Sequence, residues 1–240
     1  YHFAGSVIPL RMRKKKNLIP RMERCAALIE REPAARRGRW LADFPGYREL
    51  RLEIGCGRGR FTVETAKENP DVFFVALEKV ADAMIIGLER AMAEGLGNIR
   101  FIVGDAASLP EIFGEGEVDR IYLNFPDPWP GRRHAKRRLT SDRFLPLYKA
   151  VLRPGGQVHF KTDNSELFEY SLQMFKEAGF ALSEVTRNLH ENGPAGVMTD
   201  YEMKFYAQGV SINRCVATFL GETMDKPAPE NPERAEKDDE

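Results

Sequence analysis

The sequence contains few of the residues that build disulfide frameworks or metal centres. Its three cysteines, Cys25, Cys56 and Cys215, are odd in number and widely spaced. This excludes a disulfide-stapled fold and predicts free thiols in a reducing compartment, which we expect to be the cytoplasm. The four histidines show none of the spacings typical of metal ligands, so we expect a protein that uses no metal.

Long apolar runs and an excess of one charge are also absent. No stretch of about 18 uncharged apolar residues occurs, so we expect no membrane span. The apolar residues at 1–10 precede the basic cluster at 11–16, which is the reverse of the order in a secretory signal. Thirty-six basic residues balance thirty-six acidic ones, which argues against a generic polycationic nucleic-acid binder.

The charge is nevertheless unevenly distributed. From Asp225 to Glu240 the chain holds seven acids and three bases, a net of −4, so the remainder of this neutral chain carries +4. We predict a basic N-terminal extension at 1–16, one main domain at 17–220, and an acidic tail at 221–240. The tail has few apolar residues, which predicts disorder. With 42% hydrophobic residues, the rest can form one sizeable core.

The chain alternates between strand and helix patterns, which is typical of an α/β fold with a mostly parallel sheet and helices on both faces. Proline and glycine end several of the helices. We expect strands at 50–54, 72–77, 99–103, 118–123, 157–162, 181–186 and 213–220, and helices at 19–31, 60–68, 81–94, 141–152 and 165–177. We expect one of the late strands to be antiparallel.

A glycine-rich turn links the first strand to the next helix. Gly55, Gly57 and Gly59 stand at alternate positions, which bares the backbone to a ligand. A dinucleotide fingerprint needs a further glycine where this chain has Arg60, and the acidic Glu53 would repel a diphosphate. S-adenosylmethionine carries a sulfonium and an ammonium, which a carboxylate favours. The alternative interpretation is a tight strand-to-helix turn without a ligand.

Acidic residues recur where the next strands end. Glu78 follows the second strand at the spacing of a carboxylate that binds ribose hydroxyls, and Asp105 follows the third, where it could accept from the adenine amine. Open α/β sheets bind ligands at the carboxyl ends of their strands. Each acid alone is an ordinary turn residue, but their regular recurrence predicts a cofactor site.

The fourth strand leads into Asn124-Phe125-Pro126-Asp127-Pro128-Trp129. Its prolines stiffen the segment, so we expect Asp127 to be presented rigidly above the sheet edge. Methyl transfer from a sulfonium to a nitrogen with a free lone pair depends more on positioning than on a general base. Guanine N7 fits this requirement, because it has no proton to lose. We assign Asp127 the role of stabilising the positive charge that develops on an alkylated purine. The alternative is a proline-rich surface turn.

Five fixed positive charges follow at 132–138. Such a run is usually a solvated face, but beside a base-binding loop we interpret it as a grip on RNA phosphates. Thr199 and Glu202 lie three residues apart, which matches a helix capping box. Glu202, supported by Asp163, could instead accept from the N1 and N2 donors of guanine.

These motifs resemble the bacterial tRNA (guanine-N7)-methyltransferase family. The resemblance spans about Arg11 to Phe219, and the segments that carry it are 53–59, 125–129, 133–134, 136–138, 161–164 and 199–205. It implies a Rossmann-like class I methyltransferase fold and methyl transfer from S-adenosylmethionine to a guanosine N7 in the variable loop of tRNA. By resemblance, Glu53, Glu78, Asp105 and Asp127 contact the cofactor, Asp127 is also catalytic, and Asp163, Thr199, Asp200, Tyr201 and Glu202 contact the substrate nucleotide.

One position departs from the family. A lysine usually stands two residues after the tryptophan, and here that position is Gly131. We expect Arg132 or Arg133 to supply the missing charge, because a glycine lets the loop shift by one residue. Two other functions stay open: a methyltransferase for another RNA or a small molecule, and an RNA-binding protein without catalysis. We expect a monomer or a homodimer.

Overall fold

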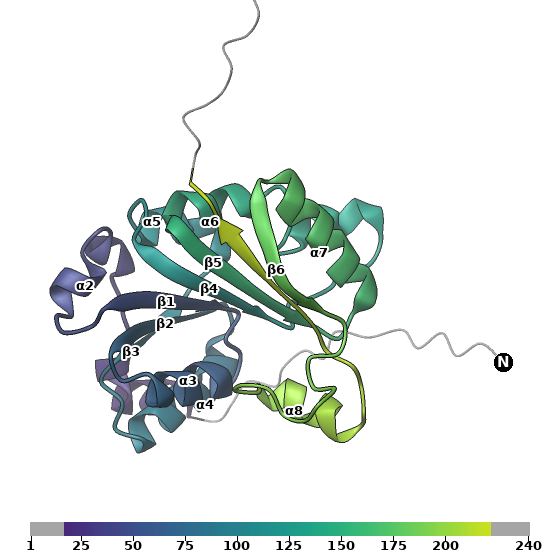
Figure 1. Cartoon of the computed structure of the whole chain (residues 1–240). Coiled ribbons are helices and arrows are strands. Elements are labelled where there is room, and N and C mark those ends of the chain that lie inside the picture. The colour runs from purple at the N-terminus through teal and green to yellow at the C-terminus, as the bar shows by residue number, and fades with distance from the viewer. Residues whose placement is uncertain (1–16, 222–240) are drawn as a thin grey trace, which may run out of the picture.

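The computed structural model describes residues 17–221, so the predicted extension at 1–16 and the predicted tail, apart from Gly221, lie outside the described residues. Seven strands form one sheet in the order β3-β2-β1-β4-β5-β7-β6 (Figure 1). The strands are β1 (Glu49–Ile54), β2 (Val72–Glu78), β3 (Ile99–Val103), β4 (Val118–Asn124), β5 (Leu152–Thr162), β6 (Phe180–Thr186) and β7 (Asn213–Phe219).

The strand order places the carboxyl ends of β1 and β4 side by side. Strands β1 to β5 pair in parallel, whereas β7 runs antiparallel between β5 and β6. The predicted α/β fold with an antiparallel late strand is therefore confirmed. The chain goes outward from β1 to β3 and then returns to β4 on the other side of β1. Such a reversal opens the crevice in which sheets of this type bind ligands.

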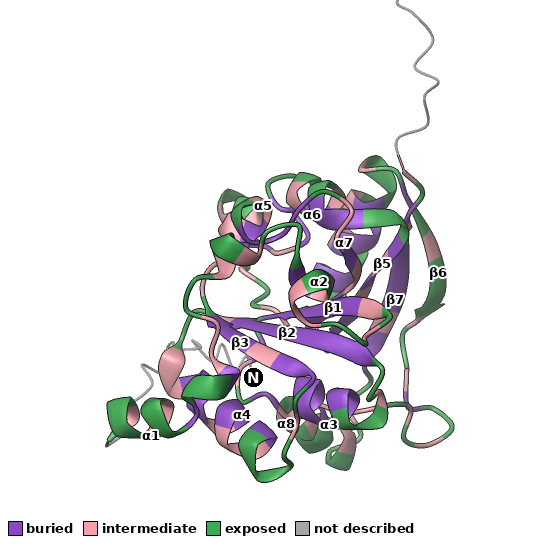
Figure 2. Cartoon of the chain, turned by 90° about the vertical axis from the view of Figure 1, so that its left-hand side faces the viewer, coloured by how far each residue is buried: buried purple, intermediate pink, exposed green. Residues whose placement is uncertain are grey.

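Helices cover both faces of the sheet (Figures 1 and 2). They are α1 (Leu18–Arg24), α2 (Trp40–Asp43), α3 (Arg60–Glu68), α4 (Ala81–Ala93), α5 (Leu109–Ile112), α6 (Leu145–Val151), α7 (Ser165–Glu177) and α8 (Asp200–Ala207). One buried cluster joins α5, α6 and α7 to the sheet, and a second joins α3 and α4 to the opposite face. Alternate strand residues serve the two clusters: Phe73 enters the first and Phe74 the second. None of the described helices is long and apolar enough to cross a membrane.

Two predicted helices are shorter than expected. The first ends at Arg24, because the chain then forms a 3-10 turn and Ile29 bridges to Phe101 beside the edge strand β3. The helix predicted from 141 begins at Leu145, with Pro146 in its first turn, where a missing N–H costs nothing. The residues before it form turns instead of helix. The basic segment 132–137 forms a 3-10 helix that the sequence did not indicate.

A pair of glycines sets the distance between α3 and α4. A Cβ on Gly59 would lie 2.6 Å from the Cα of Gly87, and a Cβ on Gly87 would lie 2.9 Å from the Cα of Gly59. Both distances are shorter than any real Cβ contact, so only glycine fits at this crossing. Gly59 is therefore a packing residue as well as part of the glycine turn.

Candidate active site

The glycine turn has the backbone conformation that its residues predict. Gly55, Gly57 and Gly59 have φ angles of +76°, +55° and +70°, a region that other residues rarely adopt. The turn ends at Arg60, where α3 begins. The Gly57 N–H donates to Glu78 Oε2 at 2.9 Å, and the Val80 N–H donates to the other Glu78 oxygen at 2.9 Å. A carboxylate thus occupies the backbone donor that a bound diphosphate would need.

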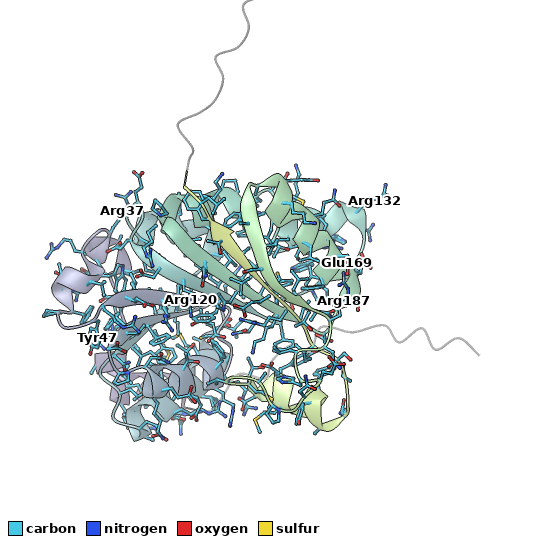
Figure 3. All side chains as sticks on the ribbon, in the orientation of Figure 1. Arg37, Tyr47, Arg120, Arg132, Glu169 and Arg187 are labelled. Atoms are coloured by element: carbon cyan, nitrogen blue, oxygen red, sulfur yellow. The ribbon has the colours of Figure 1, made fainter. Side chains whose placement is uncertain are left out.

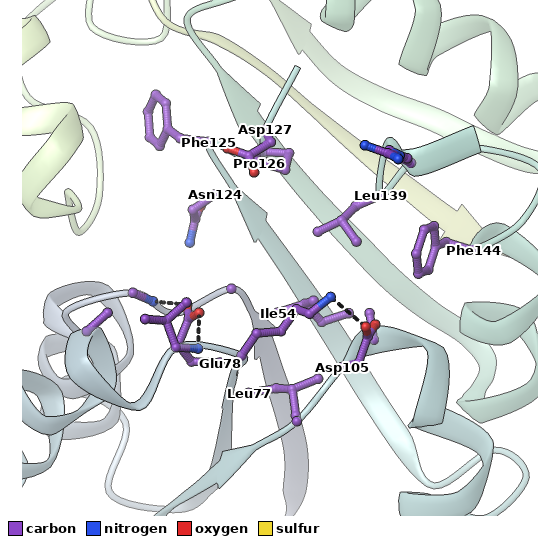
Figure 4. A pocket seen from close by; sticks show the side chains of 18 of the residues that line it. Ile54, Leu77, Glu78, Asp105, Asn124, Phe125, Pro126, Asp127, Leu139 and Phe144 are labelled. Carbon is purple, nitrogen blue, oxygen red and sulfur yellow. Dashed lines mark hydrogen bonds and ion pairs between the residues drawn. The ribbon is translucent and has the colours of Figure 1, made fainter. Parts of the chain in front are cut away.

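The carboxyl ends of the strands surround a cavity of about 670 Å³, which we call the larger cavity. Glu78 and Asp105 stand on one wall, and the segment from Asn124 to Asp127 forms the opposite wall (Figure 4). Ile54, Leu77 and Ala106 add apolar surface. Three of the four predicted cofactor carboxylates therefore line one cavity, and its mixture of apolar surface with a few polar groups is typical of a small-molecule site.

Asp105 is held in its charged form. Lys79 Nζ lies 2.6 Å from one carboxylate oxygen, and the Ala107 N–H donates to the other at 2.9 Å. The hydrogen bond from Lys79, followed by that from Ala107, lowers the pKa of Asp105. Asp105 therefore faces the larger cavity as a carboxylate with free acceptor capacity.

Glu53 faces a second, smaller cavity of about 300 Å³, which we call the smaller cavity. Its side chain is buried; it accepts a hydrogen bond from Asn124 Nδ2 at 2.8 Å and another from the Thr62 hydroxyl. Burial raises the pKa of Glu53, while these two hydrogen bonds and the charge of Lys161 oppose the shift. Gly55, Gly57, Asn124 and Phe125 line both cavities, which are therefore contiguous.

The proline-rich loop that carries Asp127 is strained and braced. Phe125 and Trp129 have φ angles of +53° and +41°, which cost free energy for residues of this size. Arg138 holds the loop: its Nε donates to the carbonyl of Pro128 at 3.0 Å and its Nη2 donates to that of Trp129 at 3.3 Å. Asp127 itself is exposed and lines the larger cavity.

The arginines of the basic strip at 132–138 differ in burial and in their contacts. Arg138 is buried and also pairs with Glu166 at 3.2 Å, so the expectation that all five charges of the strip grip phosphate is wrong for this residue. Arg132 and Arg133 are exposed and line neither cavity; Arg132 lies at the outer edge of the molecule (Figure 3). Arg137, which belongs to the predicted strip, does line the larger cavity, and so does Arg143, which the sequence did not indicate.

Helix α8 begins at the predicted capping box. The Thr199 side chain accepts from the Glu202 N–H at 2.9 Å, and a Glu202 oxygen accepts from the Thr199 N–H at 3.2 Å. Asp200 is bound by both terminal nitrogens of Arg90, at 2.8 and 3.1 Å, which anchors α8 to α4. The Tyr201 ring lies against Phe125 with 5.2 Å between ring centroids. Thr199, Asp200 and Tyr201 all line the smaller cavity.

Glu202 does not have the position expected of a residue that reads a base. It is fully buried and lines neither cavity; one oxygen accepts from Lys161 Nζ at 2.6 Å, and the other contacts His190 Nε2 at 3.0 Å. Because the side chain is fully enclosed and reaches neither cavity, the described conformation presents no edge of Glu202 to guanine. Asp163 is half-buried at the end of β5 and also lines neither cavity.

The described residues contain no group of three or more histidines, cysteines or carboxylates that could hold a metal. Cys56 is buried between the two cavity-lining glycines Gly55 and Gly57. Burial, followed by the charges of Glu53 and Glu78, raises its pKa well above the ordinary value, so the thiolate needed for covalent catalysis is disfavoured. Cys56 therefore serves as a small packing residue in the glycine turn.

Comparisons with known proteins agree with this architecture. The chain is 19% identical to the antibiotic-resistance methyltransferase Kmr, with a TM-score of 0.54 over 77% of this chain and 92% of that one. It is 21% identical to the 16S rRNA methyltransferase KamB, with a TM-score of 0.55 over 72% and 88% of the two chains. These two likenesses show the class I methyltransferase fold alone.

Sequence comparisons are more specific. A family model described as "Putative methyltransferase" matches residues 48–215. The chain is also 45% identical over 177 residues to the tRNA (guanine-N(7)-)-methyltransferase of Macrococcus caseolyticus (strain JCSC5402), which covers 73% of this chain and 84% of that protein. The region matched by the family model contains every carboxylate that lines the two cavities. The chain therefore belongs to the family of tRNA (guanine-N7)-methyltransferases.

Proposed function

We propose that this protein transfers a methyl group from S-adenosylmethionine to N7 of a guanosine in the variable loop of tRNA. Its 45% identical relative is a tRNA (guanine-N(7)-)-methyltransferase, which supports tRNA as the substrate. The observation that most supports S-adenosylmethionine as the cofactor is the hydrogen bond from the Gly57 N–H to Glu78. Here a carboxylate takes the place that a phosphate of a dinucleotide would need. We further propose that the enzyme acts in the cytoplasm, without a metal, as a monomer or a homodimer.

The residues of the larger cavity fit the proposed cofactor. Glu78 has two oxygens fixed by backbone N–H groups and can still accept from ribose hydroxyls, and Asp105 can accept from an adenine amine. Ile54, Leu77 and Ala106 offer apolar surface to the purine. Glu53 would favour the ammonium group from the smaller cavity. When bound, S-adenosylmethionine supplies an electrophilic methyl group on a sulfonium.

The chain's own residues would position the acceptor and stabilise its charge. Phe125 and Tyr201 line the smaller cavity as an aromatic pair against which a base would stack. Guanine N7 has no proton to lose, so no general base is required. Asp127 lies on the rim of the larger cavity and would stabilise the positive charge that alkylation leaves on the purine. Arg138 keeps this carboxylate in place by holding the loop.

The test is incubation of the protein with radiolabelled S-adenosylmethionine and unmodified tRNA, followed by mapping of the alkylated base. Asp127→Asn keeps the size of the side chain and removes its charge. We expect kcat to fall by about 100-fold, as is typical when one electrostatic contact to a transition state is lost, while the fold persists. Asp142→Asn, an exposed neighbour that lines neither cavity, is the control. An unchanged rate in Asp127→Asn would remove this assignment.

We also propose that two arginines outside the cavities contact the tRNA. Arg132 and Arg133 are exposed beside the Asp127 loop and offer their charges to tRNA. Substituting each separately by alanine should weaken tRNA binding in at least one variant, and unchanged affinity in both would exclude their replacing the family lysine at Gly131. A substrate other than tRNA would be indicated by turnover on another RNA or without any RNA.

A further inference from the structure

The smaller cavity has more positive charge than its own acids neutralise. Arg58, Arg60 and Lys204 line it together with two acids, Glu53 and Asp200. Glu53 is engaged by Thr62 and Asn124, and Asp200 is engaged by both terminal nitrogens of Arg90. Within residues 17–221, none of the three cations lies within ion-pair distance of a carboxylate. Their charges are therefore available to a ligand.

Neighbouring cations are used differently. Arg90 pairs with Asp200, Lys161 with Glu202, and Arg187 with Glu169, at 2.6–2.8 Å. These pairs connect α8 and the segment before it to the rest of the molecule, whereas Arg58, Arg60 and Lys204 hold no described element in place by an ion pair. Unpaired cations that converge on one cavity indicate a site for an anion.

Arg60 adds an independent observation. Its Nε is buried without a hydrogen-bond partner among the described residues, although the residue lines the cavity. A buried unpaired donor is costly and usually marks a missing ligand or water. Arg60 is also the first residue of α3, whose first turn contains no acid. The positive end of this helix therefore adds to the same potential.

The walls of the cavity indicate what carries the anion. Phe125 and Tyr201 line it with their rings 5.2 Å apart, and Tyr201 is 47% exposed. An aromatic surface next to convergent cations suits a nucleotide, whose base stacks and whose phosphate meets the positive charge. A cationic methyl donor is better served by the larger cavity, where Glu78, Asp105 and Asp127 gather.

We propose that Arg58, Arg60 and Lys204 form a subsite for a backbone phosphate of the RNA, next to the nucleotide that is methylated. The proposal rests on the proposed function and adds to it the residues that hold the substrate backbone at the site. Arg58 reaches the phosphate from the glycine turn and Lys204 from α8, so the substrate would bridge two elements that line the cavity from different parts of the chain.

The experiment uses Arg58→Ala, Lys204→Ala and the double variant, because both side chains are exposed and their loss should not disturb folding. Binding of unmodified tRNA is measured by fluorescence anisotropy at several salt concentrations. We expect each single variant to bind about five- to tenfold more weakly, and the slope of log K against log salt to fall by about one per lost contact. Lys176→Ala, an exposed lysine on α7 that lines neither cavity, should change neither quantity.

Calorimetry with S-adenosylmethionine alone distinguishes the competing anion, which is the carboxylate of the cofactor. We expect its affinity to be unchanged in both single variants. Weaker cofactor binding with normal tRNA affinity would overturn the proposal, and so would unchanged tRNA affinity in the double variant. Mapping of the methylated base with the wild-type protein distinguishes failure of the proposed function from failure of the phosphate subsite. If no guanine N7 is methylated, the proposed function fails. If methylation is normal and the variants bind tRNA as the wild type does, only the phosphate subsite is refuted.

Discussion

His159 illustrates how neighbouring charges act on a single residue. It lies on β5 among Arg51, Arg120, Arg214 and Lys161, and contacts Gln157 Oε1 at 3.0 Å. Burial, followed by the charge of Arg120 and the other cations, lowers the pKa of His159 to about 3. The folded protein thus keeps this ring neutral where an unfolded chain would protonate it.

This shift makes the stability dependent on pH. The folded pKa of about 3 lies below the ordinary value of 6.5, so the contribution of His159 is complete above pH 6.5 and is lost as the pH falls toward 3. Between pH 7 and pH 5 the wild type should lose about 2 kcal/mol more unfolding free energy than His159→Gln. Urea unfolding at both pH values measures this, and parallel losses in the two proteins would contradict it.

Glu202 gives a second prediction at the scale of residues. Burial lowers the pKa of Lys161, and the Glu202 carboxylate opposes that shift. Glu202→Gln leaves Lys161 buried without its partner, so we expect a loss of about 3–5 kcal/mol in unfolding free energy, as for other broken buried pairs.

The double variant Glu202→Gln with Lys161→Met should recover much of that loss, because it removes both charges. The measurement is urea unfolding of the wild type, Glu202→Gln, Lys161→Met and the double variant, treated as a double-mutant cycle. If Glu202→Gln instead kept its stability and accepted bases other than guanine, Glu202 would be a base-reading residue after all.

At the scale of elements, the site depends on how α3 is seated against α4. Gly59 and Gly87 touch at this crossing, and Gly59 also ends the glycine turn. Any separation of the two helices would move Arg60 and the backbone donors of the turn. Packing between helices is thus coupled directly to the geometry of both cavities.

Gly87→Ala tests this coupling. The new methyl group would lie 2.9 Å from Gly59 and 3.0 Å from Phe101, so we expect a destabilisation of about 1–3 kcal/mol, together with weaker cofactor binding. Gly97→Ala is the matched control, since the nearest atom to its Cβ is 4.0 Å away; it should change stability by less than about 0.5 kcal/mol. Thermal unfolding of the two variants, with and without S-adenosylmethionine, measures both effects. Equal stability of the two variants would show that α3 and α4 can separate freely.

At the scale of the whole molecule, the cofactor should act as part of the fold. It would contact the ends of several strands at the crevice between β1 and β4, so binding requires the assembled sheet. At a concentration about a hundred times its Kd, S-adenosylmethionine should stabilise the protein by about 2.7 kcal/mol. This corresponds to a rise of about 5–10 °C in Tm.

The comparison ligand for this experiment is a nicotinamide dinucleotide, which carries a diphosphate. It should leave the Tm unchanged, because Glu78 already occupies the Gly57 N–H. A dinucleotide that stabilised the protein as strongly as S-adenosylmethionine would contradict the cofactor assignment. Differential scanning fluorimetry of one protein preparation with each ligand is sufficient.

The sequence alone determined the features that depend on local chemistry. The bounds of α3 and α7 and the capping box at Thr199 follow from periodicity and capping residues, and the positive φ angles follow from the spacing of the glycines. The carboxylates at the ends of the strands were also predictable, because parallel strands present those ends at one edge of the sheet.

Only the tertiary structure decided which of these groups face a ligand and which support others. In the sequence, Arg138 and Glu202 look like the neighbouring residues that are exposed or line a cavity. In the structure both are buried, and Arg138 binds the Pro128 carbonyl while Glu202 binds Lys161. Arg58, Arg60 and Lys204 line one cavity because the fold brings the glycine turn, α3 and α8 together there. The physical reason is that burial and charge pairing depend on contacts between distant segments, which local patterns do not encode.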